Sequence, residues 1–126
     1  MSLPEVLIVD DDRLLRTMVR EALADVPCVV TEAADGDQGL AAIASRSPAV
    51  VLLDLVMPGK SGLEVLKALQ GRGARPVVLV LSALDSEALV QKALADGAQG
   101  YLPKPIHPLD LRNLVRGALE GVGGPP

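Results

Sequence analysis

The stretch Ala49-Val50-Val51-Leu52-Leu53-Asp54 places five apolar residues directly before a carboxylate, and it is the most apolar of several such runs in the chain. Short apolar runs that alternate with helical patterns are typical of buried parallel strands. We therefore predict a central strand at 49–53. Four further strands are expected at Glu5 to Val9, Cys28 to Glu32, Val77 to Leu81 and Gln99 to Leu102.

The segments between these strands carry helix signals. Asp12 is placed to cap a helix whose apolar residues recur at three- and four-residue spacing. Ser61 to Glu64 matches a capping box, and Pro108 suits the first turn of the last helix. The remaining helices are expected at 37–45 and 86–95. Five strand–helix units in a row predict an α/β fold with a doubly wound parallel sheet. We expect one domain over 1–120, with 121–126 as a linker stub or disordered tail.

Composition narrows the function classes. The chain has 126 residues, 49% of them hydrophobic, and a net charge of −4, with no Trp, no Phe and one Tyr. This argues against direct nucleic-acid binding, which needs clustered basic residues or a stacking platform. No apolar run approaches the ~18 residues of a membrane span, and no secretory signal is apparent. The lone Cys28 cannot form an internal disulfide. We expect a cytoplasmic protein.

Polar residues follow four of the predicted strands: Asp10 and Asp11, then Asp54, Ser82 and Lys104. In open α/β sheets, ligands bind beyond the carboxyl ends of the strands. Carboxylates gathered there repel one another unless a cation neutralises them. Mg²⁺ suits such a site because it takes one or two carboxylates together with phosphate oxygens. The sequence therefore predicts a site that binds a divalent metal and handles a phosphoryl group.

Within that site, Asp54 is the candidate nucleophile, because a carboxylate can attack a phosphoryl donor to form an aspartyl phosphate. Phosphoryl transfer asks the protein mainly for positioning and charge neutralisation. Lys104 would supply positive charge beside the metal. The Ser82 hydroxyl would donate a hydrogen bond to a phosphoryl oxygen.

These residues make the chain resemble the receiver domain of two-component response regulators, of the chemotaxis-regulator type, from Glu5 to about Leu119. The resemblance implies a flavodoxin-like (βα)5 fold with strand order 2-1-3-4-5. Ser82 stands where Thr is commoner, and Ser61 where many members have Asp. The motifs that carry the resemblance are Val9-Asp10-Asp11-Asp12, Asp54-Leu55-Val56-Met57-Pro58 with Gly62, Leu81-Ser82-Ala83, and Tyr101-Leu102-Pro103-Lys104-Pro105.

The resemblance also implies roles for individual residues. Asp54 would accept a phosphoryl group from a histidine kinase or phosphotransfer protein, with Ser82 and Lys104 contacting the phosphoryl oxygens. Mg²⁺ would be held by Asp11, Asp54 and the backbone carbonyl of Val56, with Asp10 acting through water. Such a domain catalyses its own phosphorylation and slow dephosphorylation without being a turnover enzyme.

A conformational switch is implied as well. Tyr101 would move inward when Ser82 is drawn to the phosphoryl group, changing the face made by the last two helices and the fifth strand. That face would meet an output domain or target protein, or a second copy in a phosphorylation-dependent homodimer. Val56 and Leu84 occupy positions that tune dephosphorylation, and their apolar side chains predict a long-lived phosphoryl form. A cis bond before Pro105 is also expected.

Three alternatives stay open. A phosphatase with an aspartate nucleophile typically has a second acid two positions later, where this chain has Val56. A flavin or nucleotide binder would want a Gly-rich loop after the first strand, where this chain has Asp10-Asp11-Asp12-Arg13. The third alternative is a docking module that works without phosphorylation.

Overall fold

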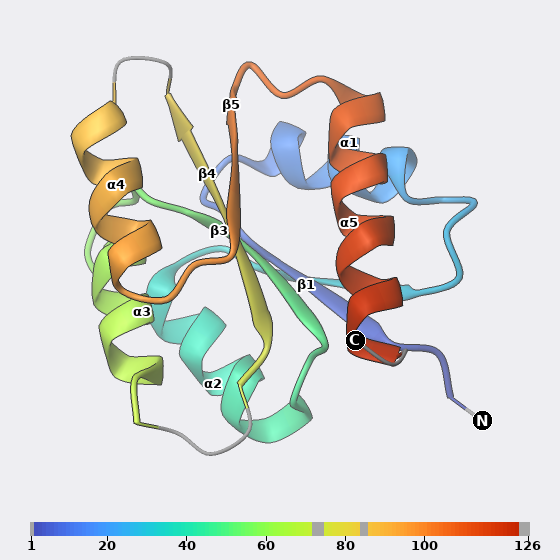
Figure 1. Ribbon diagram of the computed structural model, residues 1–126, viewed down its shortest axis with the longest axis horizontal. Coiled ribbons are helices and arrows are strands. Elements are labelled where there is room, and N and C mark those ends of the chain that lie inside the picture. The colour runs from blue at the N-terminus through green and yellow to red at the C-terminus, as the bar shows by residue number, and fades with distance from the viewer. Residues whose placement is uncertain (1, 72–74, 84–85, 124–126) are drawn as a thin grey trace.

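A five-stranded parallel sheet in the order β2-β1-β3-β4-β5 forms the centre of the molecule, with helices on both faces (Figure 1). The computed structural model describes residues 2–71, 75–83 and 86–123. The predicted sheet order is confirmed. The strands are β1 (Glu5–Val9), β2 (Val29–Ala33), β3 (Val50–Asp54), β4 (Val77–Ala83) and β5 (Gly100–Lys104); the helices are α1 (Arg13–Ala22), α2 (Gly36–Arg46), α3 (Gly62–Leu69), α4 (Glu87–Ala95) and α5 (Pro108–Gly123).

Alternate residues of the strands contribute to two hydrophobic layers, one on each face of the sheet. Leu7, Val51 and Leu53 point to the side covered by α2, α3 and α4, whereas Ile8 and Leu52 point to α1 and α5. Figure 1 shows these two groups of helices on opposite sides of the sheet. Every residue of β3 is buried, as expected for the central strand with helices on both faces.

The strands run further than the apolar pattern predicts. β3 includes Asp54, β4 continues through Ser82 to Ala83, and β5 continues to Lys104. The ladder pairs Ser82 with Pro103 and Ala83 with Lys104, because backbone pairing does not stop where the apolar side chains stop. Asp54, Ser82 and Lys104 therefore lie within the sheet, whereas Asp10 and Asp11 follow the end of β1.

Three predicted helix starts are confirmed. The Asp12 carboxylate accepts hydrogen bonds from the backbone N–H groups of Leu14 and Leu15, and Ser61 Oγ accepts one from Glu64 N. Pro108 is the first residue of α5. The Lys104–Pro105 peptide bond is cis, as expected.

The end of α5 differs from the sequence expectation. The helix runs to Gly123, whereas the tail was expected to begin at residue 121. Leu119 packs against the core, and each further residue extends a formed helix at small cost. Residues 124–126 of the expected tail lie outside the described residues. Across the described part of the chain, no helix combines the length and apolar character that crossing a bilayer requires.

Candidate functional site

The sheet brings the predicted acidic residues together at the carboxyl ends of β1 and β3. These strands are neighbours with Val9 opposite Leu53, so the residues that follow each of them come close. One carboxylate oxygen from each of Asp10, Asp11 and Asp54 lies within 4.8 Å of the others. Asp10 and Asp54 are buried, whereas Asp11 is exposed. The predicted gathering of carboxylates beyond the carboxyl ends of the strands is confirmed.

Lys104 lies between the two buried carboxylates. Its Nζ is 3.1 Å from Asp10 Oδ2 and 3.3 Å from Asp54 Oδ2. The strand order explains this placement only in part, because β4 separates β5 from β3. The long side chain extends back across the end of β4 to reach the acidic pair. The ammonium is half-buried, and burial lowers its pKa, but the charges of Asp10 and Asp54 outweigh this and raise the pKa overall. Lys104 therefore carries a positive charge at neutral pH.

Asp54 is held in an environment that opposes its ionisation. Burial and then the neighbouring Asp10 charge raise its pKa from the usual 3.8 to about 6. The backbone N–H of Val56, which donates to Asp54 Oδ1 over 3.2 Å, and the Lys104 ammonium act in the opposite direction. At neutral pH the Asp54 carboxylate is ionised, but its negative charge is only partly compensated by Lys104 and the Val56 N–H. Additional positive charge nearby would stabilise it.

The donor set fits Mg²⁺. Asp10 Oδ2 is buried and receives no hydrogen bond from the described residues. The Lys104 ammonium is the cation beside this oxygen, with Nζ 3.1 Å away. Lys104 carries one positive charge and faces Asp54 as well, so the three carboxylates keep an excess of negative charge that a further cation would compensate. Three carboxylates with one exposed side match the preference of Mg²⁺ for a few oxygen ligands and several waters.

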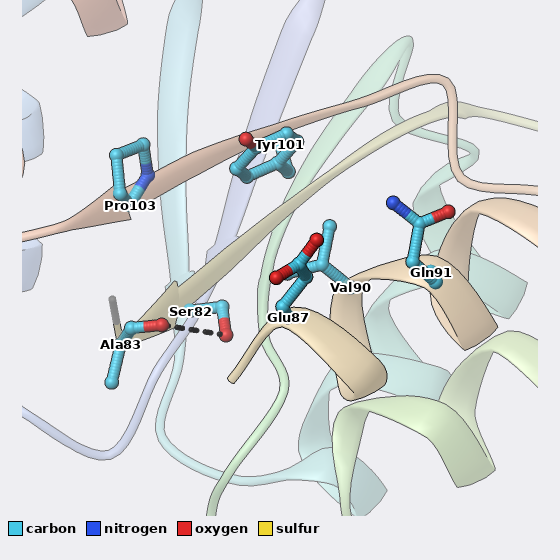
Figure 2. A pocket seen from close by; sticks show the side chains of 7 residues that line it. All are labelled: Ser82, Ala83, Glu87, Val90, Gln91, Tyr101 and Pro103. Atoms are coloured by element: carbon cyan, nitrogen blue, oxygen red, sulfur yellow. Dashed lines mark hydrogen bonds between the residues drawn. The ribbon is translucent and has the colours of Figure 1, made fainter. Parts of the chain in front are cut away.

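Ser82 and Tyr101 line one cavity of about 250 Å³ beside the acidic cluster. Figure 2 shows that β4 supplies Ser82 and Ala83, β5 supplies Tyr101 and Pro103, and α4 supplies Glu87, Val90 and Gln91. Ser82 is buried, and among the described residues its hydroxyl makes one long hydrogen bond, of 3.4 Å, to the carbonyl of Ala83. This weak bond leaves the hydroxyl able to take a better acceptor.

Tyr101 is 49% exposed, so its ring lies at the rim of the cavity rather than inside it. The cavity offers space on the α4 side of the ring, between Val90 and Gln91 of that helix and Ser82 of β4. Of the two residues expected to tune dephosphorylation, Val56 is 61% exposed next to Asp54. Leu84 lies outside the described residues.

Sequence reasoning missed Glu87 and Arg16 in this region, and it named Gly62 only as part of a motif. Glu87 of α4 lines the Ser82 cavity together with Val90 and Gln91. The three- and four-residue spacing of these residues was visible in the sequence and places them on one face of the helix. Gly62 packs so closely under β3 that a Cβ there would lie 2.3 Å from the backbone oxygen of Asp54. Arg16 reaches the backbone of Asp10 from α1, and its helical spacing gave no sign of this.

Comparisons with known proteins agree with this geometry. Residues 6–116 match the family described as the response regulator receiver domain. The chain is 39% identical over 118 residues to the nitrate/nitrite response regulator protein NarL of Escherichia coli (strain K12), covering 92% of this chain and 55% of NarL. It is 40% identical over 115 residues to the response regulator MprA of Mycobacterium tuberculosis (strain ATCC 25177 / H37Ra), covering 91% of this chain and 50% of MprA. The chain thus spans about half the length of these relatives.

Solved structures give the same result. The signal receiver domain of a LuxO repressor protein from Vibrio parahaemolyticus superposes with a TM-score of 0.90 at 26% identity, covering 96% of this chain and 93% of that one. The chemotaxis response regulator CheY4 of Vibrio cholerae superposes with a TM-score of 0.84 at 32% identity, covering 93% of this chain and 99% of that one.

Proposed function

This chain belongs to the response regulator receiver domain family, and we propose that it is a phosphorylation-controlled signalling domain in which Asp54 accepts the phosphoryl group. The observation that carries the proposal is the placement of Lys104 between the buried Asp10 and Asp54, with Asp11 completing the acidic cluster. A structural ion pair would need one carboxylate partner. Here one ammonium faces a surplus of negative charge, which is the arrangement expected of a site that takes a cation and a phosphoryl group.

In the proposed reaction, a carboxylate oxygen of Asp54 attacks the phosphorus of a phosphohistidine. A P–O bond to Asp54 forms while the P–N bond to the donor imidazole breaks, and the imidazole keeps the electron pair of that bond. Lys104 compensates negative charge on the phosphoryl oxygens, and Ser82 donates its weakly engaged hydroxyl to one of them. The Val56 N–H orients the Asp54 carboxylate by holding Oδ1.

Mg²⁺ would be held by Asp11, Asp54 and the backbone carbonyl of Val56, with Asp10 acting through water. When bound, it supplies positive charge that lowers the repulsion between the carboxylates and the phosphoryl group. Asp10 is suited to an indirect role because it is fully buried, with Oδ1 accepting a hydrogen bond from Asp12 N over 2.9 Å.

The proposed partners are a sensor histidine kinase or phosphotransfer protein upstream and an output domain or target protein downstream, in the cytoplasm. The chain covers about half of NarL and MprA, so an output domain in the same polypeptide is part of this proposal, with 1–120 as the receiver. The face of α4, β5 and α5 would transmit the signal through Tyr101, and a phosphorylation-dependent homodimer would use the same face.

The deciding experiment is intact mass spectrometry after incubation with acetyl phosphate, with and without Mg²⁺, on wild type and Asp54→Asn. We expect one base-labile phosphoryl adduct that needs both Mg²⁺ and Asp54. An adduct that persists in Asp54→Asn would place the acceptor elsewhere. No adduct under any condition would overturn the proposal in favour of a docking module.

A further inference from the structure

We propose that Arg16 is a positioning residue that fixes the backbone of the acidic cluster in the orientation that binds Mg²⁺. This inference rests on the proposed function, since it concerns the metal site of the same reaction. Arg16 lies one turn into α1 and contacts no carboxylate of the cluster among the described residues. It acts on the main chain that carries them.

Two hydrogen bonds fix the Arg16 guanidinium. Nη1 donates to the backbone carbonyl of Asp10 over 2.7 Å, and Nε donates to Glu32 Oε1 of β2 over 2.9 Å. The side chain is only 14% exposed. Because a guanidinium is planar and rigid, holding one edge on Glu32 fixes where the other edge presents its donor. The carbonyl of Asp10 is thereby tied to the neighbouring strand.

The Asp10 carbonyl matters because it shares a planar peptide unit with the amide of Asp11. Fixing that carbonyl restricts the rotation of the whole unit and hence the direction of the exposed Asp11 side chain. Asp10 is also held by its N–H, which donates to Ala33 O over 3.1 Å, and by Oδ1, which accepts from Asp12 N. Without Arg16, one of these three restraints is lost where the chain leaves the sheet.

Arg20 gives the proposal a matched control, because it shares the partner Glu32 with Arg16. The Glu32 carboxylate pairs with both arginines. Hydrogen bonds from Arg20 and then from Arg16 lower the pKa of Glu32, so Glu32 stays ionised at neutral pH. Arg20 is 49% exposed and shares the Glu32 partner, but its described hydrogen bonds do not include Asp10. Replacing either arginine removes one positive charge and one bond to Glu32. Only the replacement of Arg16 frees the Asp10 carbonyl.

The sign of the effect separates positioning from simple electrostatics. Removing a positive charge near an acidic site should strengthen cation binding or leave it unchanged. Loss of positioning should weaken it instead. Removing hydrogen-bond partners that orient metal ligands typically lowers affinity about 10- to 100-fold. We therefore expect Arg16→Met to raise the Mg²⁺ dissociation constant at least about tenfold.

The test is calorimetric titration with MgCl₂, without any phosphoryl donor, on wild type, Arg16→Met and Arg20→Met, with urea unfolding in EDTA measured in parallel. We expect weaker Mg²⁺ binding in Arg16→Met, near wild-type binding in Arg20→Met, and similar small losses of stability in both. Arg16→Lys keeps the charge but cannot hold Glu32 and Asp10 through one rigid plane, so it should also bind Mg²⁺ more weakly than wild type.

Equal affinity in Arg16→Met and Arg20→Met, tighter binding in Arg16→Met, or wild-type affinity in Arg16→Lys would each overturn the positioning role. Wild type that binds no Mg²⁺ would overturn both this inference and the metal in the proposed function. If the proteins bind Mg²⁺ in the expected order of affinity but wild type forms no phosphoryl adduct, the result would support the inference and overturn only the proposed function.

Discussion

Replacing Asp54 by asparagine should stabilise the metal-free protein at neutral pH. The folded protein raises the pKa of Asp54 from 3.8 to about 6, mainly through burial and then through the Asp10 charge. An acid with a raised pKa binds more protons when folded than when unfolded, so its contribution to stability is present at low pH and is lost as pH rises from about 4 through about 6. At pH 7 the loss is complete.

The magnitude follows from the shift. At about 1.4 kcal/mol per pKa unit, the ionised Asp54 lowers the free energy of unfolding by up to about 3 kcal/mol at pH 7, but by much less at pH 4, where the carboxyl group of the folded protein is protonated. The side chain is 5% exposed, so screening by water removes little of this. Asparagine keeps an oxygen to accept from Val56 N and carries no charge. We expect Asp54→Asn to raise the free energy of unfolding by up to about 3 kcal/mol at pH 7 and by much less at pH 4.

The assay is urea unfolding in EDTA at pH 4 and pH 7, followed by far-ultraviolet circular dichroism, because the chain has no Trp and its single Tyr is half exposed. Asp37→Asn is the matched control, since it removes an 81% exposed carboxylate and should change stability by no more than about 0.5 kcal/mol. A stabilisation of Asp54→Asn that is equal at both pH values, or wild type being the more stable protein at pH 7, would refute the reasoning.

Three further predictions test other parts of the site. Gly62→Ala should destabilise the fold by about 1–3 kcal/mol in urea unfolding and slow phosphorylation of Asp54, because the new Cβ would meet the β3 backbone. The control is Gly117→Ala in α5, where a Cβ would meet no described atom, and it should be neutral or slightly stabilising; equal effects of the two substitutions would contradict this prediction. Val56→Asn should speed decay of the phosphoryl form by adding a polar group that can orient water, and unchanged decay in a timed mass-spectrometric assay would count against the long-lived form. Tyr101→Ala should leave phosphorylation intact while weakening partner binding, so equal loss of both would contradict the switch.

The sequence predicted most of this fold because local and long-range signals agree. Each apolar run is short and alternates with a helical pattern, and polar site residues follow four of the five runs. Strand order and the edge that carries the site therefore follow from the resemblance and from the rules for parallel sheets. The ends of the strands were less predictable. Side-chain hydrophobicity marks where burial stops, whereas pairing of Ser82 with Pro103 is a backbone property that apolar patterns do not encode.

Arg16 shows a second limit of sequence reasoning. On a helix, an arginine between apolar positions is typical of a solvated face. Its contacts with Glu32 and the Asp10 carbonyl depend on the distance between α1 and β2, which no local pattern specifies. The same holds for Glu87, whose approach to Ser82 depends on how α4 lies against β4. Residues that touch the reacting group follow strands and are visible in sequence, whereas those that support it from helices are not.

The charges of the site connect its instability with its proposed function. When ionised, the three carboxylates of the cluster exceed the single ammonium of Lys104 by two negative charges, an excess that a divalent cation would balance. On the proposed function, converting the Asp54 carboxylate to an acyl phosphate replaces one negative charge by about two, so one negative charge again lacks compensation. Among the described residues, the Ser82 hydroxyl is a donor engaged in one long hydrogen bond of 3.4 Å. Its movement toward the phosphoryl group would empty space beside Tyr101 in the cavity they share, so the electrostatic excess that destabilises the resting fold would also drive the switch.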